Sequence, residues 1–284
     1  MDGIKGKTAV VTGSTRGLGL AIARGLAREG AAVVLASRSG AAVEQSVAAL
    51  RAEGLRAAGM AVDVADLSQV EALANLAQRE FGRLDIWVNN AGLAGTYGPT
   101  LDFAPEDFLR VVQTNIIGLY YGSRTAARYF VAQRSGKLIN ILGHGYNGPV
   151  TWQNAYAASK AWVRSFTASL AAETRESGIG VFAYNPGLVL TELLTDVEVF
   201  SGHEEKLKNF DTVVRLLARP PEEAARGAVR LASAATDGQT GLLVNNFSPL
   251  AALGSLADDG LRRLLRRPAR EIKIQIESVP PAAK

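Results

Sequence analysis

Short apolar runs alternate with longer segments of helical periodicity along most of this chain. The runs predict β-strands over residues 8–12, 31–36, 59–62, 84–88, 137–141, 179–184 and 241–244. Between them, apolar residues at helical spacing predict helices over 18–29, 42–53, 67–81 and 105–133, one that opens at Asn154, and one that begins at Pro220-Pro221. This alternation predicts an α/β fold, a Rossmann-type three-layer sandwich in which helices flank a seven-stranded parallel sheet.

The pattern changes in the last third of the chain. Residues 192–219 look helical but broken, with apolar positions at Leu193, Leu194, Val199, Phe200, Leu207 and Phe210. A mobile lid over a substrate and a surface helix pair both fit this profile. Further on, residues 261–270 contain five arginines, Arg262, Arg263, Arg266, Arg267 and Arg270, and residues 271–276 alternate like a strand. We expect a catalytic domain over 1–250 and an extension over 251–284 that packs on the domain or at an oligomer interface.

Composition removes several classes of function. The chain of 284 residues has no cysteine, which excludes disulfides, thiolate metal sites and cysteine nucleophiles. Its two histidines lack metal-ligand spacing, so we expect no metal site. The start of the chain lacks the apolar region of a signal peptide, and no apolar run reaches the roughly 20 residues of a membrane span, so we expect a cytoplasmic protein without a membrane partner. A net charge of +4 is too small to indicate nucleic-acid binding.

A glycine-rich turn separates the first predicted strand from the first predicted helix. Glycines at positions 13, 17 and 19 permit a tight turn and a close backbone approach, and the helix N-terminus that follows attracts a pyrophosphate. A tight turn that binds nothing is the alternative, but a strand before the turn and a helix after it are the context that dinucleotide binding requires. The residues that we expect to contact a cofactor here are Gly13, Ser14, Arg16, Gly17, Leu18 and Gly19.

The second predicted strand ends in Ser37-Arg38, without the acidic residue that commonly selects NAD. Together with Arg16, these side chains would hold a 2′-phosphate through charge-assisted hydrogen bonds, which favours NADP(H). The third strand is followed by Asp63, whose carboxylate would accept a hydrogen bond from an adenine amino group or mark a helix start.

Tyr156 and Lys160 are four residues apart, so they share one face of the helix that opens at Asn154. A neighbouring ammonium favours ionisation of a phenol, and the pair would then transfer a proton at neutral pH. Asn115 lies within the apolar segment 111–117, where an amide needs a hydrogen-bonding partner. We expect it to be buried and linked to water rather than exposed on the helix surface.

In combination, these residues resemble the short-chain dehydrogenase/reductase family over about residues 5–247. The matching pieces are Thr12-Gly13-x-x-x-Gly17-x-Gly19, Asp63-Val64, Asn89-Asn90-Ala91-Gly92, Asn115, Tyr156-x-x-x-Lys160 and Pro186-Gly187-x-Val189-x-Thr191. The resemblance implies a nicotinamide cofactor bound by these segments. It implies that Tyr156 is the general acid/base, that Lys160 binds the nicotinamide ribose and lowers the tyrosine pKa, and that Asn115 holds a water of a proton relay. It also implies that helices 105–133 and 154 onward pair subunits into a homodimer or homotetramer.

The chain departs from the family pattern at one position. Where the family has a serine thirteen residues before the tyrosine, this sequence has Gly143. Loss of one such hydrogen-bond donor typically costs about 10²–10³ in rate. Another donor could replace it, with His144 as the first candidate. Alternatively, the glycine admits a bulky substrate, which Trp152 and Tyr97 would favour, or redox chemistry has been lost.

The predicted function is therefore an NADP(H)-dependent oxidoreductase that interconverts a carbonyl and a secondary alcohol on a bulky apolar or aromatic small molecule. The alternative is a protein of the same fold that binds a cofactor as a regulatory or structural subunit, or that catalyses a different reaction.

Overall fold

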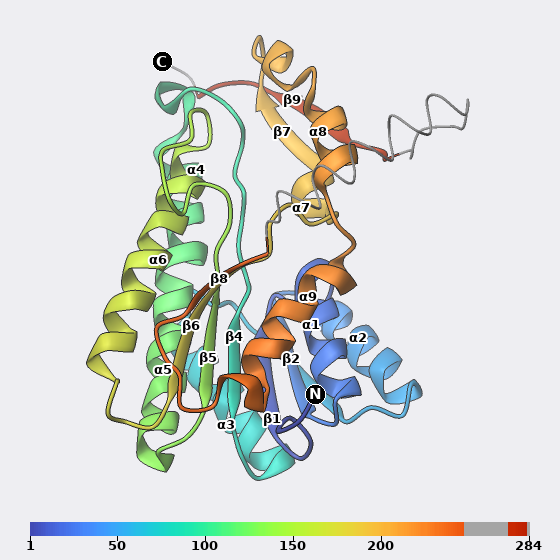
Figure 1. The fold of residues 1–284 in the computed structure, drawn as a ribbon. Helices are drawn as coiled ribbons and strands as arrows, with labels where there is room; N and C mark the ends of the chain where they lie inside the picture. Colours follow the sequence, from blue (N-terminus) through green and yellow to red (C-terminus); the bar gives the residue numbers. More distant parts are fainter. Residues whose placement is uncertain (247–271, 283–284) are drawn as a thin grey trace, which may run out of the picture.

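The computed structural model of the chain describes residues 1–246 and 272–282. Its main sheet has seven parallel strands, as the sequence predicts, and their order is β3-β2-β1-β4-β5-β6-β8 (Figure 1). The strands are β1 Thr8–Thr12, β2 Ala32–Ser37, β3 Ala57–Ala61, β4 Ile86–Asn89, β5 Lys137–Ile141, β6 Gly180–Asn185 and β8 Leu243–Asn245.

Helices cover both faces of this sheet and complete the predicted three layers. The flanking helices are α1 Gly17–Arg28, α2 Gly40–Ala52, α3 Leu67–Phe81, α4 Pro105–Val112, α5 Leu119–Gln133, α6 Asn154–Glu173 and α9 Pro221–Ala232. Helices α1, α2 and α9 pack on one face, and α3, α5 and α6 pack on the other. Because both faces are covered, β1, β5 and β6 are buried along their whole length.

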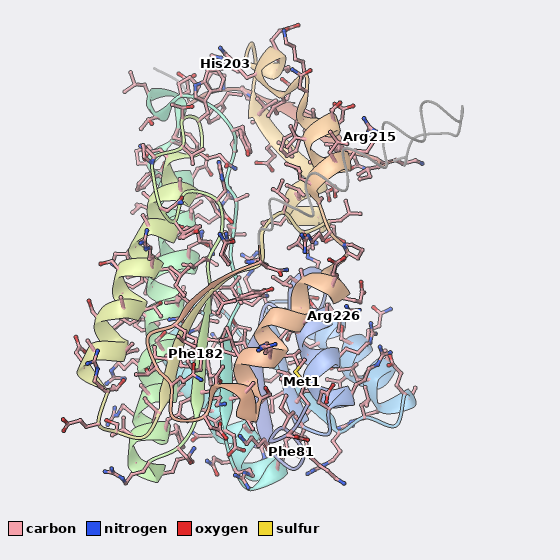
Figure 2. The ribbon with its side chains drawn as sticks, in the orientation of Figure 1. Met1, Phe81, Phe182, His203, Arg215 and Arg226 are labelled. Atoms are coloured by element: carbon pink, nitrogen blue, oxygen red, sulfur yellow. The ribbon has the colours of Figure 1, made fainter. Side chains whose placement is uncertain are left out.

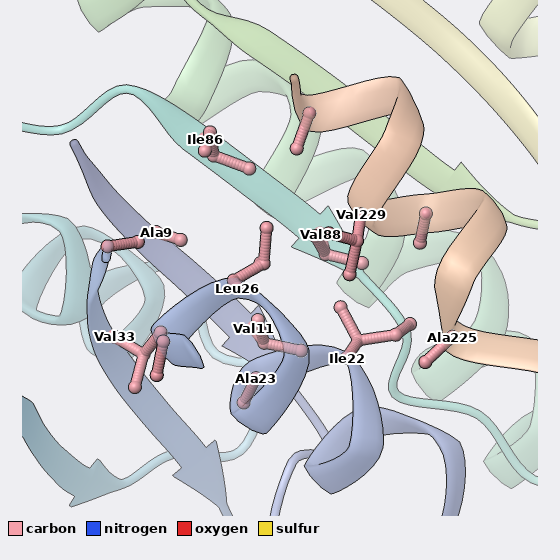
Figure 3. Close-up of a cluster of buried hydrophobic side chains, with 14 of the residues drawn as sticks. Ala9, Val11, Ile22, Ala23, Leu26, Val33, Ile86, Val88, Ala225 and Val229 are labelled. Atoms are coloured by element: carbon pink, nitrogen blue, oxygen red, sulfur yellow. The ribbon is translucent and has the colours of Figure 1, made fainter. Parts of the chain in front are cut away.

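One half of the core lies between the sheet and the α1–α9 pair. Ile22 and Leu26 are one turn apart on α1 and face the sheet at Val11 and Val88, while Val229 approaches from α9 (Figure 3). The first four of these side chains have no exposed surface, and Val229 is 5% exposed. Packing of this density fixes the position of α1, and therefore of the glycine turn that precedes it.

Local sequence signals explain where several helices begin and end. Asp66 caps α3 by accepting hydrogen bonds from the backbone N–H groups of Ser68 at 2.8 Å and Gln69 at 3.3 Å. At the other end, Gly82 has the left-handed φ of +77° that favours glycine. Asp63 lies three residues before this cap, at the carboxyl end of β3.

The predicted helix over 105–133 is one helical segment that changes its winding in the middle. Between α4 and α5, residues Gln113–Gly118 form a π-helical turn that contains the buried Asn115. A π-turn adds one residue to a helical turn and shifts the faces of the flanking helix, and such turns often lie at functional sites.

The segment 192–219 differs from the prediction, because it contains a strand as well as helices. It comprises α7 Glu192–Thr195, β7 Asp196–Phe200, a 3₁₀ turn over Glu204–Leu207 and α8 Phe210–Leu217. Strand β7 pairs in parallel with β9 Gln275–Val279, and the two lie beyond the main sheet (Figure 1). The strand predicted over 271–276 therefore begins later, at Gln275. The five arginines over 261–270 lie outside the described residues.

The order of the strands marks where a ligand site is expected. Strand β1 lies between β2 and β4, so the connections leave it in opposite directions. In doubly wound sheets, ligands bind at the carboxyl ends of the strands at this switch point. Among the residues that the structure describes, no helix is both long and apolar enough to span a membrane.

Candidate active site

The glycine turn has the geometry of a phosphate-binding turn. Gly13 and Gly17 have φ values of +61° and +53°. At Gly19, an added Cβ would lie 2.2 Å from the carbonyl oxygen of Gly13, so only glycine permits this close helix–strand approach. No acidic side chain lies in the first turn of α1, and no side chain caps its N-terminus. Its N–H groups are therefore available to an anion, and the turn fits a dinucleotide pyrophosphate.

Asn90 stabilises this turn, a role that was not predicted from the sequence. Its Nδ2 donates hydrogen bonds to the carbonyl oxygens of Thr12 at 2.9 Å and Gly13 at 3.0 Å. In return, the Thr12 hydroxyl accepts from the N–H groups of Asn90 at 3.0 Å and Ala91 at 3.1 Å. The carboxyl ends of β1 and β4 are thereby joined on both sides of the switch point. The sequence signal that could have indicated this role is the pair of adjacent asparagines, Asn89-Asn90, at the end of a predicted strand.

Two residues that were expected at the cofactor have side chains that bond inside the protein. Ser14 is fully buried, and its hydroxyl donates to the Val11 carbonyl at 2.7 Å and accepts from the Ala36 N–H at 3.1 Å. The Asn89 amide donates to Asn140 Oδ1 at 2.9 Å and accepts from Trp87 Nε1 at 2.7 Å. Both residues support the strands on which the site is built.

The residues expected to bind the 2′-phosphate and the adenine lie at or after the ends of β1, β2 and β3. Arg38 is exposed, and Ser37 is partly exposed. Arg16, which precedes α1, forms an exposed ion pair with Glu192 at the start of α7. The Asp63 carboxylate accepts from the Ala65 N–H at 2.9 Å and remains exposed.

Asn115 is buried, and its side chain is satisfied by protein groups. Its Oδ1 accepts from the Leu93 N–H at 2.8 Å, and its Nδ2 donates to the Leu93 carbonyl at 2.9 Å and to Ser159 Oγ at 3.1 Å. The amide therefore joins the π-turn to the segment after β4 and to α6. Gly92 lies beside it, since a Cβ there would be 3.4 Å from Asn115 Oδ1 and 3.8 Å from Lys160 Nζ.

Tyr156 and Lys160 lie together at this junction, one turn apart on α6. Lys160 is 5% exposed, its Nζ donates to the Ile141 carbonyl at 3.1 Å, and it lies 5.5 Å from the centroid of the Tyr156 ring. Burial lowers the pKa of Lys160 to about 8.

The pKa of Tyr156 is shifted in the direction opposite to the one expected from the sequence. Burial of the phenol raises this pKa, and the neighbouring Tyr97 raises it further. The expectation that the ammonium lowers it is wrong, because burial disfavours the charged forms of both groups, the phenolate and the ammonium.

Gly143 follows β5 and lies against Tyr156. A Cβ added at Gly143 would be 2.1 Å from the tyrosine hydroxyl. His144, the candidate substitute donor, is exposed, and its side chain makes no hydrogen bond with the part of the chain that the structure describes.

The loop after β6 returns across the glycine turn. A Cβ added at Gly17 would lie 3.0 Å from the methyl group of Thr191, so this loop touches the start of α1. Val189 pairs with Arg219 through a β-bridge, which fixes the middle of the loop to the end of the 192–219 segment. Of the other loop residues predicted to contact the cofactor, Pro186 is buried and Gly187 has a φ of +77°.

Aromatic side chains connect the 192–219 segment with the loops on this side of the molecule. The Trp152 ring packs edge-on against His203, with centroids 4.7 Å apart, and the Tyr97 ring lies 6.3 Å from that of Phe210. Trp152 has a φ of +73°, which is unusual for a bulky residue. His203 lies at the outer end of the segment, far from Phe81 at the opposite end of the molecule (Figure 2).

A doubly wound parallel sheet with a glycine turn at its switch point defines an α/β dinucleotide-binding protein. Over the described residues, no group of three or more His, Asp or Glu side chains could hold a metal ion. The chain belongs to the short chain dehydrogenase family, whose profile matches residues 7–200.

Comparison with known proteins supports this membership. The chain is 34% identical over 276 residues to the "Probable chlorophyll(ide) b reductase", chloroplastic, of Oryza sativa subsp. japonica, an alignment that covers 90% of this chain and 53% of the relative. The chain thus spans about half the length of this curated relative.

Two solved structures share the fold at TM-scores of 0.78 and 0.76, each at 29% sequence identity. The first is a variant of actinorhodin polyketide ketoreductase with NADPH, for which the match covers 88% of this chain and 99% of that one. The second is 3-ketoacyl-(acyl-carrier-protein) reductase from Brucella melitensis complexed with NADH, with 86% and 97% covered. The family is one of nicotinamide-dependent oxidoreductases, and these neighbours include both forms of the cofactor.

Proposed function

We propose that this protein is an NADP(H)-dependent oxidoreductase that interconverts a carbonyl and a secondary alcohol. The observation that carries the proposal is the convergence of Asn115, Tyr156 and Lys160 at the carboxyl end of the sheet, beside a glycine turn that fits a pyrophosphate. Few structural requirements would bring an amide, a phenol and an amine together at this edge.

When bound, a nicotinamide would supply or accept the hydride in this reaction. Tyr156 donates a proton to the carbonyl oxygen during reduction and removes it during oxidation. Lys160 would bind the ribose and, while protonated, stabilise the phenolate, so its charge at neutral pH is part of the mechanism. Asn115 holds the segment after β4 against α6 through its bonds to Leu93 and Ser159.

Preference for NADP(H) is supported by the end of β2, where Ser37 and Arg38 stand without an acidic neighbour. Replacement of Arg38 by alanine should weaken NADPH binding by about 10–100-fold and leave NADH binding nearly unchanged, since a charge-assisted bond to phosphate is lost. Arg28→Ala, at the far end of α1, is the matched control. An equal loss of affinity for NADPH and NADH in Arg38→Ala, or no loss of affinity for either, would contradict the assignment.

A bulky apolar or aromatic substrate is supported by the aromatic residues around the segment 192–219 and by relatives named for chlorophyll(ide) b and polyketide reduction. The aromatic side chains Tyr120, Trp162 and Phe166 on α5 and α6 support a homodimer or homotetramer. The cytoplasmic location and the division into a 1–250 domain and an extension stay predictions.

The proposal is tested by following NADPH absorbance with a panel of bulky ketones. Wild-type protein should consume NADPH, and Tyr156→Phe should lower turnover by about 10²–10⁴-fold with unchanged NADPH affinity. Tyr129→Phe is the control, because this tyrosine of α5 hydrogen-bonds to Asn75 on α3 and lies outside the proposed site. NADPH binding without turnover across the panel would instead support the cofactor-binding subunit without redox activity.

A further inference from the structure

The reason for a glycine at position 143 is space and not backbone conformation. Gly143 is buried just beyond the end of β5, and it is not among the residues with a positive φ. Any L-residue could therefore adopt its backbone conformation. What excludes a side chain is the neighbour: an added Cβ would be 2.1 Å from the Tyr156 hydroxyl oxygen, 3.0 Å from its Cζ and 3.4 Å from Lys160 Cε.

These distances are far inside ordinary packing, in which non-bonded carbon atoms lie about 3.5–4.0 Å apart. The hydroxyl group of Tyr156 thus occupies the volume that a side chain at position 143 would fill. The ring is attached to α6, whose first turn is fixed by the bond from Ser159 Oγ to the Tyr156 carbonyl at 2.6 Å. Because the nearest clashing atom is the far end of the tyrosine side chain, rotation of the phenol is the least costly way to make room.

The same loop contains glycines that serve as internal comparisons. Gly145 has a φ of +92°, and a Cβ there would lie 2.4 Å from Ala157 Cβ, so this residue is required by conformation and by helix packing. Gly148 has no heavy atom within 4 Å of its added Cβ and no positive φ. Within this loop, Gly143 alone opens space for the tyrosine hydroxyl.

We propose that Gly143 is a positioning residue whose lack of a side chain seats the Tyr156 phenol at the end of β5, beside Lys160. This inference rests on the proposed function for its catalytic meaning, because Tyr156 is the proton donor there. In this role, the absence of a side chain at position 143 leaves the space that the Tyr156 hydroxyl group occupies. A serine introduced at this position would displace the phenol before its own hydroxyl could act.

Crystal structures of the wild-type protein and of Gly143→Ala test the placement directly and do not depend on turnover. The wild-type hydroxyl should lie against Gly143, and the alanine should move it by more than about 1 Å, to restore an ordinary contact distance. A wild-type phenol that leaves room for a side chain at position 143, or a phenol that stays in place in the variant, would overturn the inference.

Kinetics test the catalytic consequence. Gly143→Ala and Gly143→Ser should each lower kcat by about 100-fold, the size of loss that a misplacement of about 1 Å can cause, with little change in substrate KM or NADPH affinity. Gly148→Ala, in the same loop, should keep kcat within about twofold. A gain of turnover in Gly143→Ser would show that the serine hydroxyl acts where the phenol now lies, which overturns the inference.

The two tests separate the failure of this inference from the failure of the proposed function. If wild-type protein reduces no carbonyl, the proposed function fails, while the crystallographic displacement still decides whether Gly143 seats the phenol. If wild-type protein is active and Gly143→Ala is equally active, the function stands and the positioning role is wrong.

Discussion

Lys160 is an amine that the fold removes almost entirely from water. It is 5% exposed, and among the described residues its ammonium donates one hydrogen bond, to the Ile141 carbonyl. No carboxylate of the described residues pairs with it, so burial disfavours the ammonium and lowers the pKa of Lys160 to about 8. The lysine therefore changes charge near the pH at which many enzymes work. This change can be measured as a pH dependence of the free energy of unfolding.

Stability should rise with pH because of this lysine. Between about pH 8 and 10, the unfolded chain still binds the proton that folded Lys160 has released, so the free energy of unfolding increases by about 2 kcal/mol over that range. Replacement of Lys160 by methionine removes the effect. Chemical denaturation at several pH values measures the difference between the two proteins.

Lys208→Met is the control, because Lys208 is exposed and its loss should leave the pH dependence as in wild type. Curves for wild type and Lys160→Met that stay parallel from pH 8 to 10 would contradict the burial of the amine.

For individual residues, the sequence predicted which side chains belong to the candidate site better than it predicted the tertiary contacts between them. Helical spacing was enough to place Tyr156 and Lys160 on one face, and the glycine pattern was enough to place the turn. The contact between Gly143 and the Tyr156 hydroxyl joins a loop to a helix, and no periodicity encodes it. The predicted direction of the Tyr156 pKa shift was wrong for the same reason, since the burial that causes the shift depends on the tertiary structure.

Strands β7 and β9 form an element that ties the end of the described chain to the segment 192–219. Val197 pairs with Ile276 and Phe200 with Val279, and the Ser201 N–H donates to the Val279 carbonyl at 2.9 Å. Beyond β9, the Ala282 N–H donates to the Asp102 carbonyl at 2.9 Å. Residues 275–282 therefore connect β7 with the loop before α4.

Deletion of residues 272–284 should loosen the segment 192–219 without altering the glycine turn. Loss of the β7 partner should raise the substrate KM by about 10-fold, equivalent to ~1.4 kcal/mol, and leave NADPH affinity unchanged. Hydrogen exchange of the β7 amides should increase in the same variant.

A chain that ends at Ala282 is the matched control, because it keeps β9 and the bond to Asp102. If the variant that lacks residues 272–284 keeps the wild-type substrate KM and the wild-type hydrogen exchange of the β7 amides, β9 does not hold this segment. The hypothesis that the segment is a lid held by β9 would then be contradicted.

Element prediction succeeded where a segment carries its own pattern. Helix α3 and strands β1 and β5 have the predicted bounds. Strand β7 was missed, although Val197 and Val199 alternate with acidic residues, because its short pattern lies within a segment that otherwise looks helical. Its partner lies about 80 residues later in the sequence. The π-turn at Asn115 was also missed, since one added residue barely changes the apolar spacing.

At the scale of the whole molecule, aromatic side chains gather on α5 and α6. Trp162 and Phe166 stack at 4.8 Å with an interplanar angle of 9°, and Tyr120 meets Phe166 at 6.1 Å while remaining 40% exposed. A groove of about 640 Å³ runs beside this face, lined in part by Tyr146, Ala161 and Arg164. Trp162 and Phe166 are partly buried, and aromatic side chains that stay partly exposed in this way are typical of subunit interfaces.

Phe166→Glu should therefore convert a dimer or tetramer to monomers, because it places a charge within an apolar contact. Light scattering coupled to size-exclusion chromatography gives the mass directly. Arg226→Glu, on the exposed side of α9, is the control and should keep the wild-type mass (Figure 2). A monomeric wild-type protein, or an unchanged mass in Phe166→Glu, would contradict the predicted interface.

The overall architecture was the most predictable level, because seven apolar runs separated by helices allow few arrangements other than a doubly wound parallel sheet. The arrangement of the small β7–β9 sheet was not predictable, since it depends on pairing between distant segments.

The central claim is that this site transfers a hydride while Tyr156 transfers a proton. Incubation of the protein with a bulky ketone and NADPH deuterated at the transferable C4 position tests it most directly. The account predicts that deuterium appears on the carbinol carbon of the alcohol product with wild-type protein, and that Tyr156→Phe lowers the rate of its appearance by about 10²-fold or more. Alcohol without deuterium, or equal rates in the two proteins, would contradict it.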